Sequence, residues 1–436
     1  MIKRVVTVVL VCALTLCNIP QQTVISFSFA DLIKDVPNTI DEMLSIHEYW
    51  PTDGWRFSTP EVQGMDPDII DEMNRTIYDE DYWFDSLIVV RNGYIVYEDY
   101  PSGEYNENSS HILHSATKSV SSMLIGTAIK EGFIEGVDTP ILDFFPDRIF
   151  ANMSEAKENI TLKHILTMTP GLEWDEWSFP YEVGELRNDL MAALASGDIV
   201  QYLLDKPMVA EPGEEWTYNT GCSNLLPHII QKTSNISGIA YTKEYLFNPL
   251  GITTFLWRVV NGAPLGGHEL YMKPRDMAKL GYLYLMNGTW DGQEIVTEDW
   301  IAESTSTHVD LSEKYSWWLR DGYGYQWWTM KYENWYYANG QDGQMICVLD
   351  DYDMVVVCTG YSEIGPMNSK DGPGPIVIRD YLIPAIEEYD ERLTNTSQTE
   401  SQNPLNEIGL ILTAISFPVL ATIVVAFVLL KKNRNE

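Results

Sequence analysis

Apolar and polar residues alternate with the pattern of β-strands near both ends of the central part of the chain. Residues 84–97 contain two apolar runs that meet at Asn92-Gly93, a dipeptide typical of a tight β-hairpin. Further apolar runs, rich in β-branched and aromatic residues, follow at 336–349 and 354–359. The strands therefore come from two distant parts of the sequence, and we expect them to join in one sheet.

Helical patterns occupy most of the chain between these strands. A helix is predicted over 115–130, with Gly132 as its stop signal, and a final helix over 376–389. Residues 138–310 form mostly helical segments interrupted by Gly- and Pro-containing loops. We predict an α+β fold: an antiparallel sheet from both chain ends, flanked by helices, with a mostly helical inserted subdomain.

Both termini carry long apolar segments. Lys3 and Arg4 precede an apolar run, a pattern typical of a signal peptide or an N-terminal anchor. An uncharged stretch at 408–430 is long enough for a transmembrane helix, and the basic residues after it place the C-terminus in the cytoplasm. The expected order is a signal peptide or anchor (1–30), a leader (31–50), a folded domain (51–390), a polar stalk (391–407), a transmembrane helix (408–430) and a cytoplasmic tail (431–436). The folded domain would then be extracellular, on a single-pass protein of the cell membrane.

The charge balance excludes some classes of partner. The chain has 63 acidic and 28 basic residues and a formal net charge of −35, which argues against binding nucleic acid. Triplets of the Asn-x-Ser/Thr type suggest a glycoprotein and agree with an extracellular domain. They begin at Asn74, Asn108, Asn152, Asn159, Asn235, Asn287 and Asn395.

The cysteines do not indicate a disulfide framework. Beyond the leader the chain has Cys222, Cys347 and Cys358, an odd number. Cys347 and Cys358 flank a turn, where they either pair with each other or remain two buried thiols.

The candidate chemistry begins at Ser115-x-x-Lys118, at the predicted start of a helix. This spacing puts a hydroxyl and an ammonium on one helix face, where the amine can help to activate the alcohol as a nucleophile. The spacing alone is weak, because Ser154-x-x-Lys157 repeats it inside a glycosylation triplet without other site-like residues nearby. Its context favours Ser115.

Further segments in order give that context. The segment 211–221 contains Pro212-Gly213 and Tyr218-Asn219-Thr220-Gly221, and resembles the second motif of the serine beta-lactamase and penicillin-binding protein superfamily. Gly340-Gln341-Asp342-Gly343 resembles its third motif, and 55–65, 164–176 and 271–285 resemble other family segments. The resemblance covers roughly 50–390. It is strongest to the class C beta-lactamase-related serine hydrolases, which include esterases, D-amino-acid peptidases and nylon-oligomer hydrolases.

The resemblance implies roles for particular residues. Ser115 would attack a carbonyl and form an acyl-enzyme, while Lys118 and Tyr218 would together manage the proton. Which of the two is the base stays open. The backbone amides of Ser115 and Gln341 would form the oxyanion hole. Substrate-binding positions would be Thr220, Gly340, Gly343 and Trp174, the last in a loop with Asp175, Glu176 and Trp177 that we expect at the rim of the pocket.

Two departures from the family pattern reduce the range of activities that we expect. Thr220 stands where the lactamase second motif has Asn, and Ala338-Asn339-Gly340 stands where the third motif has Lys-Thr-Gly. The cation that would hold a substrate carboxylate is therefore missing. This argues against efficient beta-lactamase action and for an esterase or amidase.

The other candidates point to no additional chemistry. His111 and His114 precede Ser115, and we expect them to serve in packing. No metal-ligand spacing occurs, so we expect neither a metal nor a cofactor. The sequence predicts an extracellular, membrane-anchored serine hydrolase that cleaves an ester or amide in a small-molecule or peptide acyl substrate. The alternatives are a D-amino-acid peptidase or transamidase, and a catalytically silent surface-binding protein on the same scaffold.

Overall fold

The computed structural model describes residues 49–79, 82–312, 321–330, 334–360, 373–389 and 392. The chain divides into two compact units, 1–49 and 50–436, and the elements below all belong to the second unit. The predicted signal peptide, most of the leader and stalk, and the transmembrane helix and tail lie outside the described residues. Within the described part of the chain, no helix is both long and apolar enough to cross a membrane.

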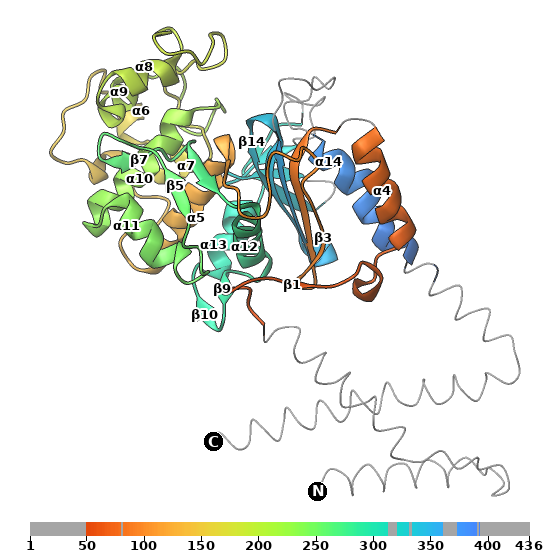
Figure 1. Ribbon diagram of the computed structural model, residues 1–436. Coiled ribbons are helices and arrows are strands. Elements are labelled where there is room, and N and C mark those ends of the chain that lie inside the picture. Colours follow the sequence, from red (N-terminus) through yellow and green to blue (C-terminus); the bar gives the residue numbers. More distant parts are fainter. Residues whose placement is uncertain are drawn as a thin grey trace, which may run out of the picture. The chain divides into compact units, whose positions relative to one another are not determined.

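A nine-stranded sheet forms the centre of the domain, in the order β1-β3-β2-β16-β15-β14-β13-β12-β11 (Figure 1). Its middle pair joins β2 to β16, so strands from the two distant parts of the sequence lie side by side, as predicted. The strands are β1 (Arg56–Phe57), β2 (Phe84–Arg91), β3 (Tyr94–Asp99), β11 (Val309–Asp310), β12 (Gly322–Tyr323), β13 (Trp328–Met330), β14 (Trp335–Gly340), β15 (Gln344–Leu349) and β16 (Met354–Gly360).

The sheet is mixed, which corrects the prediction of a purely antiparallel one. β1 pairs with β3 in parallel, whereas the other pairs of this sheet are antiparallel. The chain passes from β1 through a helix, α4 (Pro67–Asp79), and then through β2 before it forms β3. This long connection permits a parallel neighbour, which a tight hairpin cannot.

The predicted hairpin at Asn92-Gly93 is confirmed. Both residues have positive φ, 50° for Asn92 and 77° for Gly93, as a two-residue turn between twisted strands requires. Arg91 pairs with Tyr94 directly across the turn. Local sequence alone therefore determines this turn.

Helices cover both faces of the central strands. On β16, Val355 and Val357 pack in one apolar core, and Val356 and Cys358 pack in the other. The first core includes α5 (Thr117–Lys130) and α12 (Pro274–Leu285), and the second includes α4 and α14 (Gly374–Val377) (Figure 1). Because successive side chains point to opposite faces and both faces are buried, the middle parts of these strands are continuous apolar runs, as in Val355-Val356-Val357.

The segment between the sheet-forming parts is mostly helical, as predicted, with three small sheets of short strands. Its α-helices are α6 (Glu155–Glu158), α7 (Leu162–Leu166), α8 (Asp189–Ala195), α9 (Ile199–Asp205), α10 (Thr220–Ser234), α11 (Gly238–Thr242) and α13 (Glu298–Thr305). Its short strands are β4 (His111–Ile112), β5 (Phe255–Trp257), β6 (Val259–Val260), β7 (Ala263–Pro264), β8 (Leu270–Met272), β9 (Thr289–Trp290) and β10 (Gln293–Glu294).

The predicted C-terminal helix is not regular throughout. It begins as α14, continues as a π-helical turn (η8, Ile378–Leu382), and then runs as α-helix through the described residues up to 389. The sequence locates this helix correctly, but the wider turn has no evident signal in it.

Cys347 and Cys358 are two buried thiols and do not form a disulfide. Cys347 lies across from Val356, and Cys358 lies across from Met345, so the two cysteines are not directly opposite each other. Both pack in the core that contains α4 and α14. Burial raises the pKa of the Cys358 thiol, which disfavours the reactive thiolate.

Lys157, the lysine of the second Ser-x-x-Lys sequence, has a structural role. Its ammonium is buried and donates to the carbonyl oxygens of Ala151, Leu204 and Lys206 at 2.8, 2.8 and 2.7 Å. Ser154 is the N-cap of α6, and its side chain accepts from the Lys157 backbone N–H at 3.2 Å. The pair therefore ties α6 to the end of α9 and presents no reactive hydroxyl–amine contact.

We predict that Lys157→Met lowers the free energy of unfolding by about 2–3 kcal/mol, because carbonyl groups lose a charged hydrogen-bond donor. Urea unfolding followed by tryptophan fluorescence measures the change. Lys232→Met is the matched control, because Lys232 forms an exposed ion pair with Asp147 and should contribute less than about 1 kcal/mol. Equal stability of the two variants would contradict the assigned role.

Candidate active site

Ser115 and Lys118 meet at the start of the helix that the sequence predicts. A 3-10 turn (η3, His114–Ala116) leads into α5, so the regular helix begins two residues later than expected. Lys118 Nζ lies 3.1 Å from Ser115 Oγ. The lysine is only 2% exposed, whereas Ser115 is partly exposed. A hydroxyl that solvent can reach therefore has an amine directly behind it.

Besides Ser115, a carbonyl oxygen and an aromatic ring lie next to the Lys118 ammonium. It donates to the carbonyl oxygen of Gly267 at 2.9 Å, and it lies 4.9 Å from the centre of the Tyr218 ring. The Gly267 N–H in turn donates to Asn224 Oδ1 at 2.9 Å. A Cβ at Gly267 would lie 2.5 Å from a methyl carbon of Thr220, so a side chain would not fit there. The sequence did not lead us to Gly267 or Asn224. The pair Gly266-Gly267 was a sequence signal for close backbone approach at the first of them.

Tyr218 is held by a cluster of aromatic rings. Its ring stacks on Trp328 with centroids 6.3 Å apart and an angle of 19° between the planes, and it also contacts Trp216 and Trp177. Asn219 follows it as the N-cap of α10 and accepts from the Cys222 N–H at 3.1 Å. These contacts fix Tyr218 beside Lys118, so the structure brings together the three residues singled out as catalytic candidates.

The third-motif segment lies against the turn that carries Ser115. Gly340 ends β14, and a Cβ there would collide with the carbonyl oxygen of Leu113 and lie 3.2 Å from the Ala116 nitrogen. Gln341 comes next, and the chain then turns through Asp342 and Gly343 at φ 65° and 85°. The absence of a side chain at Gly340 therefore allows the Gln341 end of β14 to approach the Ser115 turn.

His114 links the same two turns. It has φ +44°, and its Nε2 lies 4.0 Å from Asp342 Oδ2. Burial lowers the pKa of His114, although Asp342 acts in the opposite direction. His111 is buried and contacts Asp85 Oδ2 at 2.7 Å through Nε2. His111 therefore connects β4 to β2, a packing role as predicted, whereas His114 faces the third-motif turn.

Thr220 and Trp174 converge on a buried carboxylate, that of Glu176. Thr220 donates its backbone N–H to Glu176 Oε2 at 2.8 Å and its hydroxyl to Oε1 at 2.7 Å, and Trp174 Nε1 donates to Oε2 at 2.6 Å. Burial raises the pKa of Glu176, while the nearby Lys118 and the bonds from Thr220 and Trp174 lower it. Sequence reasoning put Glu176 at the rim of the pocket; it is only 1% exposed because it binds the start of α10.

The exposed part of this loop begins after Glu176. Trp174 is buried and packs closely against Gly221. Trp177 is about half-exposed, and its ring centre lies 5.3 Å from that of Tyr218. Tyr181, Val183 and Leu186 are also largely exposed. The exposed ring next to Tyr218 is therefore that of Trp177, and the rest of the loop exposes both apolar and charged side chains, the latter including Glu182 and Arg187.

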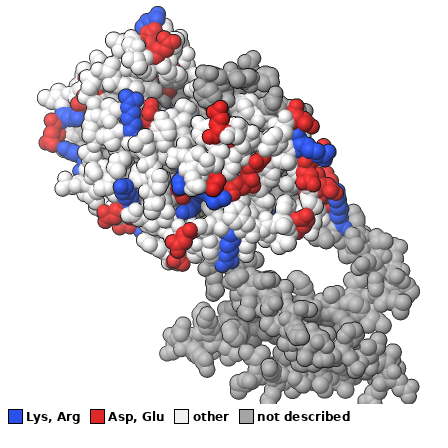
Figure 2. Space-filling view, in the orientation of Figure 1, with Lys and Arg blue, Asp and Glu red and all other residues white. Residues whose placement is uncertain are grey.

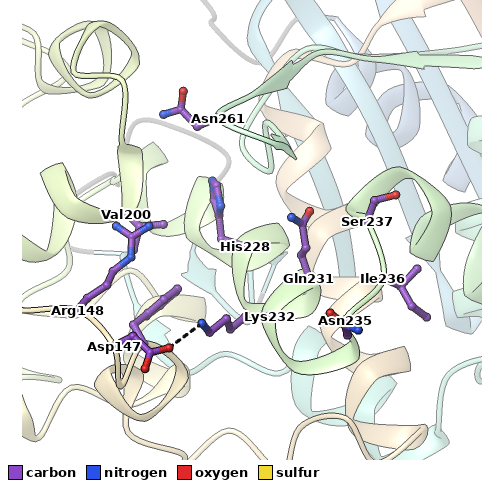
Figure 3. A pocket seen from close by; sticks show the side chains of 11 residues that line it. Asp147, Arg148, Val200, His228, Gln231, Lys232, Asn235, Ile236, Ser237 and Asn261 are labelled. Atoms are coloured by element: carbon purple, nitrogen blue, oxygen red, sulfur yellow. Dashed lines mark hydrogen bonds and ion pairs between the residues drawn. The ribbon is translucent and has the colours of Figure 1, made fainter.

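A separate hollow of about 470 Å³ lies beside the second half of α10 (Figure 3). Its lining includes Arg148, His228, Gln231 and Lys232, and Lys232 is paired with Asp147. Gln231 is eleven residues beyond Thr220, which corresponds to roughly 16 Å along the helix axis. None of the three candidate catalytic residues lines this hollow.

Charged side chains are scattered over the surface. On the face drawn in Figure 2, basic and acidic residues are interspersed over a surface that is mostly uncharged, and the basic ones form no continuous patch there. This face offers no obvious site for a polyanion.

Several known proteins are similar to this chain in sequence or in fold. One relative is monacolin J acid methylbutanoyltransferase of Aspergillus terreus, 26% identical over 158 residues, which are 34% of this chain and 38% of that protein. Among solved structures, a putative 6-aminohexanoate-dimer hydrolase from Bacillus anthracis is 21% identical, with a TM-score of 0.57 over 73% of this chain and 82% of the other. EstCE1, a hydrolase with promiscuous acyltransferase activity, is 16% identical, with a TM-score of 0.56 over 72% of this chain and 97% of the other.

The match to a whole family is broader. Residues 85–363, more than half of the chain, match the beta-lactamase family, and this range includes the serine, lysine and tyrosine described above. The chain belongs to the beta-lactamase family.

Proposed function

We propose that the protein is a serine hydrolase that forms an acyl-enzyme on Ser115. The observation that carries this proposal is the 3.1 Å contact between Lys118 Nζ and Ser115 Oγ, with the lysine buried and the serine accessible. A buried amine at hydrogen-bonding distance from the hydroxyl of a partly exposed serine is one arrangement by which a serine becomes a nucleophile.

The reaction has two halves. In the first, Ser115 Oγ attacks the substrate carbonyl while its proton passes to the Lys118–Tyr218 pair, and the leaving alcohol or amine departs with that proton. In the second, water attacks the acyl-enzyme, gives its proton to the pair, and Ser115 regains a proton as the acid is released. The backbone amides of Ser115 and Gln341 would stabilise the oxyanion in both halves.

The proposed substrate is an ester or amide without an essential carboxylate. Two features favour it. The third-motif segment has Ala338-Asn339-Gly340 instead of a lysine, and Ala338 is buried. The half-exposed ring of Trp177 lies beside Tyr218. An aromatic ring at that place suits an apolar acyl or alcohol group better than an anion.

We also propose that the domain is extracellular and anchored by the apolar segment at 408–430, with a signal peptide or anchor at the N-terminus. The positions of the glycosylation triplets support this proposal. Asn74 is partly buried, and the other described asparagines of these triplets are exposed: Asn108, Asn152, Asn159, Asn235 and Asn287.

Labelling by a fluorophosphonate tests the function, because this probe reacts covalently with activated serines. We expect the wild-type protein to be labelled and Ser115→Ala to lose labelling completely. Ser154→Ala is the matched control, because it removes the serine of the second Ser-x-x-Lys sequence. This serine caps α6 instead of acting as a nucleophile, so the variant should be labelled like wild type. An unlabelled wild-type protein, or full labelling of Ser115→Ala, would refute the proposed function and favour a silent scaffold.

Tyr218→Phe is expected to slow acylation by about a hundredfold or more, because the variant keeps the aromatic packing but loses the proton-transferring hydroxyl. Stopped-flow measurement of acyl-enzyme formation gives this rate. Tyr245→Phe, a change of the same kind outside the site, should leave the rate unchanged. If Tyr218→Phe acylates at nearly the wild-type rate, the base is Lys118 alone.

A substrate panel separates an esterase from a peptidase. We expect p-nitrophenyl esters to be cleaved efficiently, and D-alanyl peptides with a free carboxylate to gain no advantage over the same peptides with an amidated terminus. A cation that holds the carboxylate would give a preference of about ten- to a hundredfold in kcat/KM. Such a preference, or rapid turnover of a chromogenic cephalosporin, would support the D-amino-acid peptidase or lactamase alternative instead.

A further inference from the structure

Glu176 is a buried acidic residue with no part in the two half-reactions above. Its carboxylate accepts three short hydrogen bonds, from the Thr220 N–H, the Thr220 hydroxyl and Trp174 Nε1, and a longer one of 3.3 Å from the Tyr181 hydroxyl. Thr220 is two residues after Tyr218, and its methyl group faces Gly267, the acceptor of Lys118. Thr220 and Gly267 therefore connect Glu176 to Lys118, and Thr220 also follows Tyr218 closely in the sequence.

Burial raises the pKa of Glu176 overall, whereas several of its contacts act in the opposite direction and favour the ionised form. The Thr220 N–H belongs to the first turn of α10, a 15-residue helix, where the helix dipole stabilises a negative charge. Trp174 Nε1 and the Thr220 N–H can only donate, and both meet Oε2, so this oxygen cannot carry a proton without losing a bond. The Lys118 ammonium is also near enough to lower the pKa of Glu176.

We propose that Glu176 is a positioning residue that supplies a buried negative charge behind Thr220, and that this charge sets the pH at which the Lys118–Tyr218 pair takes up and releases its proton. The inference rests on the proposed function, because it assumes that this pair moves the proton of Ser115. Glu176 itself touches neither Ser115 nor Lys118 through a hydrogen bond in the described structure.

The sign of the effect follows from Coulomb's law. An ionised Glu176 stabilises every protonated form of the pair, so removing its charge lets the pair lose protons at lower pH. The part of the pH–rate profile that lies above the pKa of Glu176 should therefore move to lower pH. Wild type and a charge-free variant should differ only above the raised pKa of Glu176, where the wild-type residue is ionised.

Other titratable groups face the same region and remain in place in every variant. Near Lys118 they are His114 and His268, and near Glu176 they are Asp175, Tyr181 and Cys222. Burial lowers the pKa of His268 to about 3, so this residue is neutral over the range of the experiment. A comparison between variants cancels the contributions of these groups.

Glu176→Gln isolates the charge. The amide oxygen can replace Oε2 and keep both bonds from the Thr220 N–H and from Trp174. The amide nitrogen can replace Oε1, because both partners there are hydroxyls that can reverse and accept. The variant should therefore fold normally, which its urea unfolding curve checks.

We expect the acid limb of the rate profile of Glu176→Gln to lie about one pH unit below that of wild type, because the variant lacks the negative charge that interacts with the Lys118 ammonium. The measurement is the second-order rate of fluorophosphonate labelling of the full-length protein between pH 5 and about 10. This readout requires no knowledge of the natural substrate.

Two controls make the test specific. Glu176→Asp keeps the charge, so its profile should stay within about 0.3 units of wild type even if its maximal rate falls. Glu173→Gln removes the same formal charge from an exposed residue of the same loop and should leave both rate and profile unchanged. An unmoved profile in Glu176→Gln, or an equal shift in Glu176→Asp, would overturn the inference. Labelling that is absent in wild type would instead refute the proposed function itself.

Discussion

The burial of the Lys118 ammonium is the constraint on which the site depends. A charge taken out of water is costly unless other groups replace its hydration. Here the replacements come from four segments: Ser115 at the start of α5, Gly267 before β8, the ring of Tyr218 before α10, and the nearby carboxylate of Glu176 in the loop after α7. The requirement to satisfy one cation therefore brings these segments to one point. The same contact places the serine hydroxyl beside an amine.

Lys157 shows that burial of a lysine is not sufficient for chemistry. It has the same spacing from a serine and is at least as deeply buried. Its donors, however, are bound by three backbone carbonyl oxygens, and Ser154 is engaged as a helix cap. The ammonium of Lys157 is therefore fully used in holding α6 and α9 together. At Lys118 one donor meets a side-chain hydroxyl that solvent can reach, and this difference separates a reactive site from a structural one.

Close approach of backbone segments is the second requirement, and glycine meets it at two places. Gly340 lets the end of β14 approach the turn that carries Ser115, and Gly267 lets its own carbonyl reach Lys118 past the methyl group of Thr220. Any side chain at either position would push these segments apart. The neighbouring amides of Ser115 and Gln341 can act on one oxyanion only if that approach is kept.

The sequence alone determined the local features and the general class of this protein. The Asn92-Gly93 turn, the helix at Lys118, the two-ended sheet and the motifs around Ser115, Tyr218 and Gly340 follow from residue types and spacings, because each depends on local conformational preference or on a short pattern. The tertiary structure decided what depends on distant contacts. It made β1 a parallel edge strand, left Cys347 and Cys358 as thiols, and turned Glu176 away from the pocket rim to bind the first turn of α10. It also brought the Gly267 carbonyl to Lys118, and Asn224 to the N–H of Gly267, from more than a hundred residues away from Lys118. No local pattern encodes such partners, because a buried polar group is satisfied by whatever donor or acceptor the completed fold brings near it.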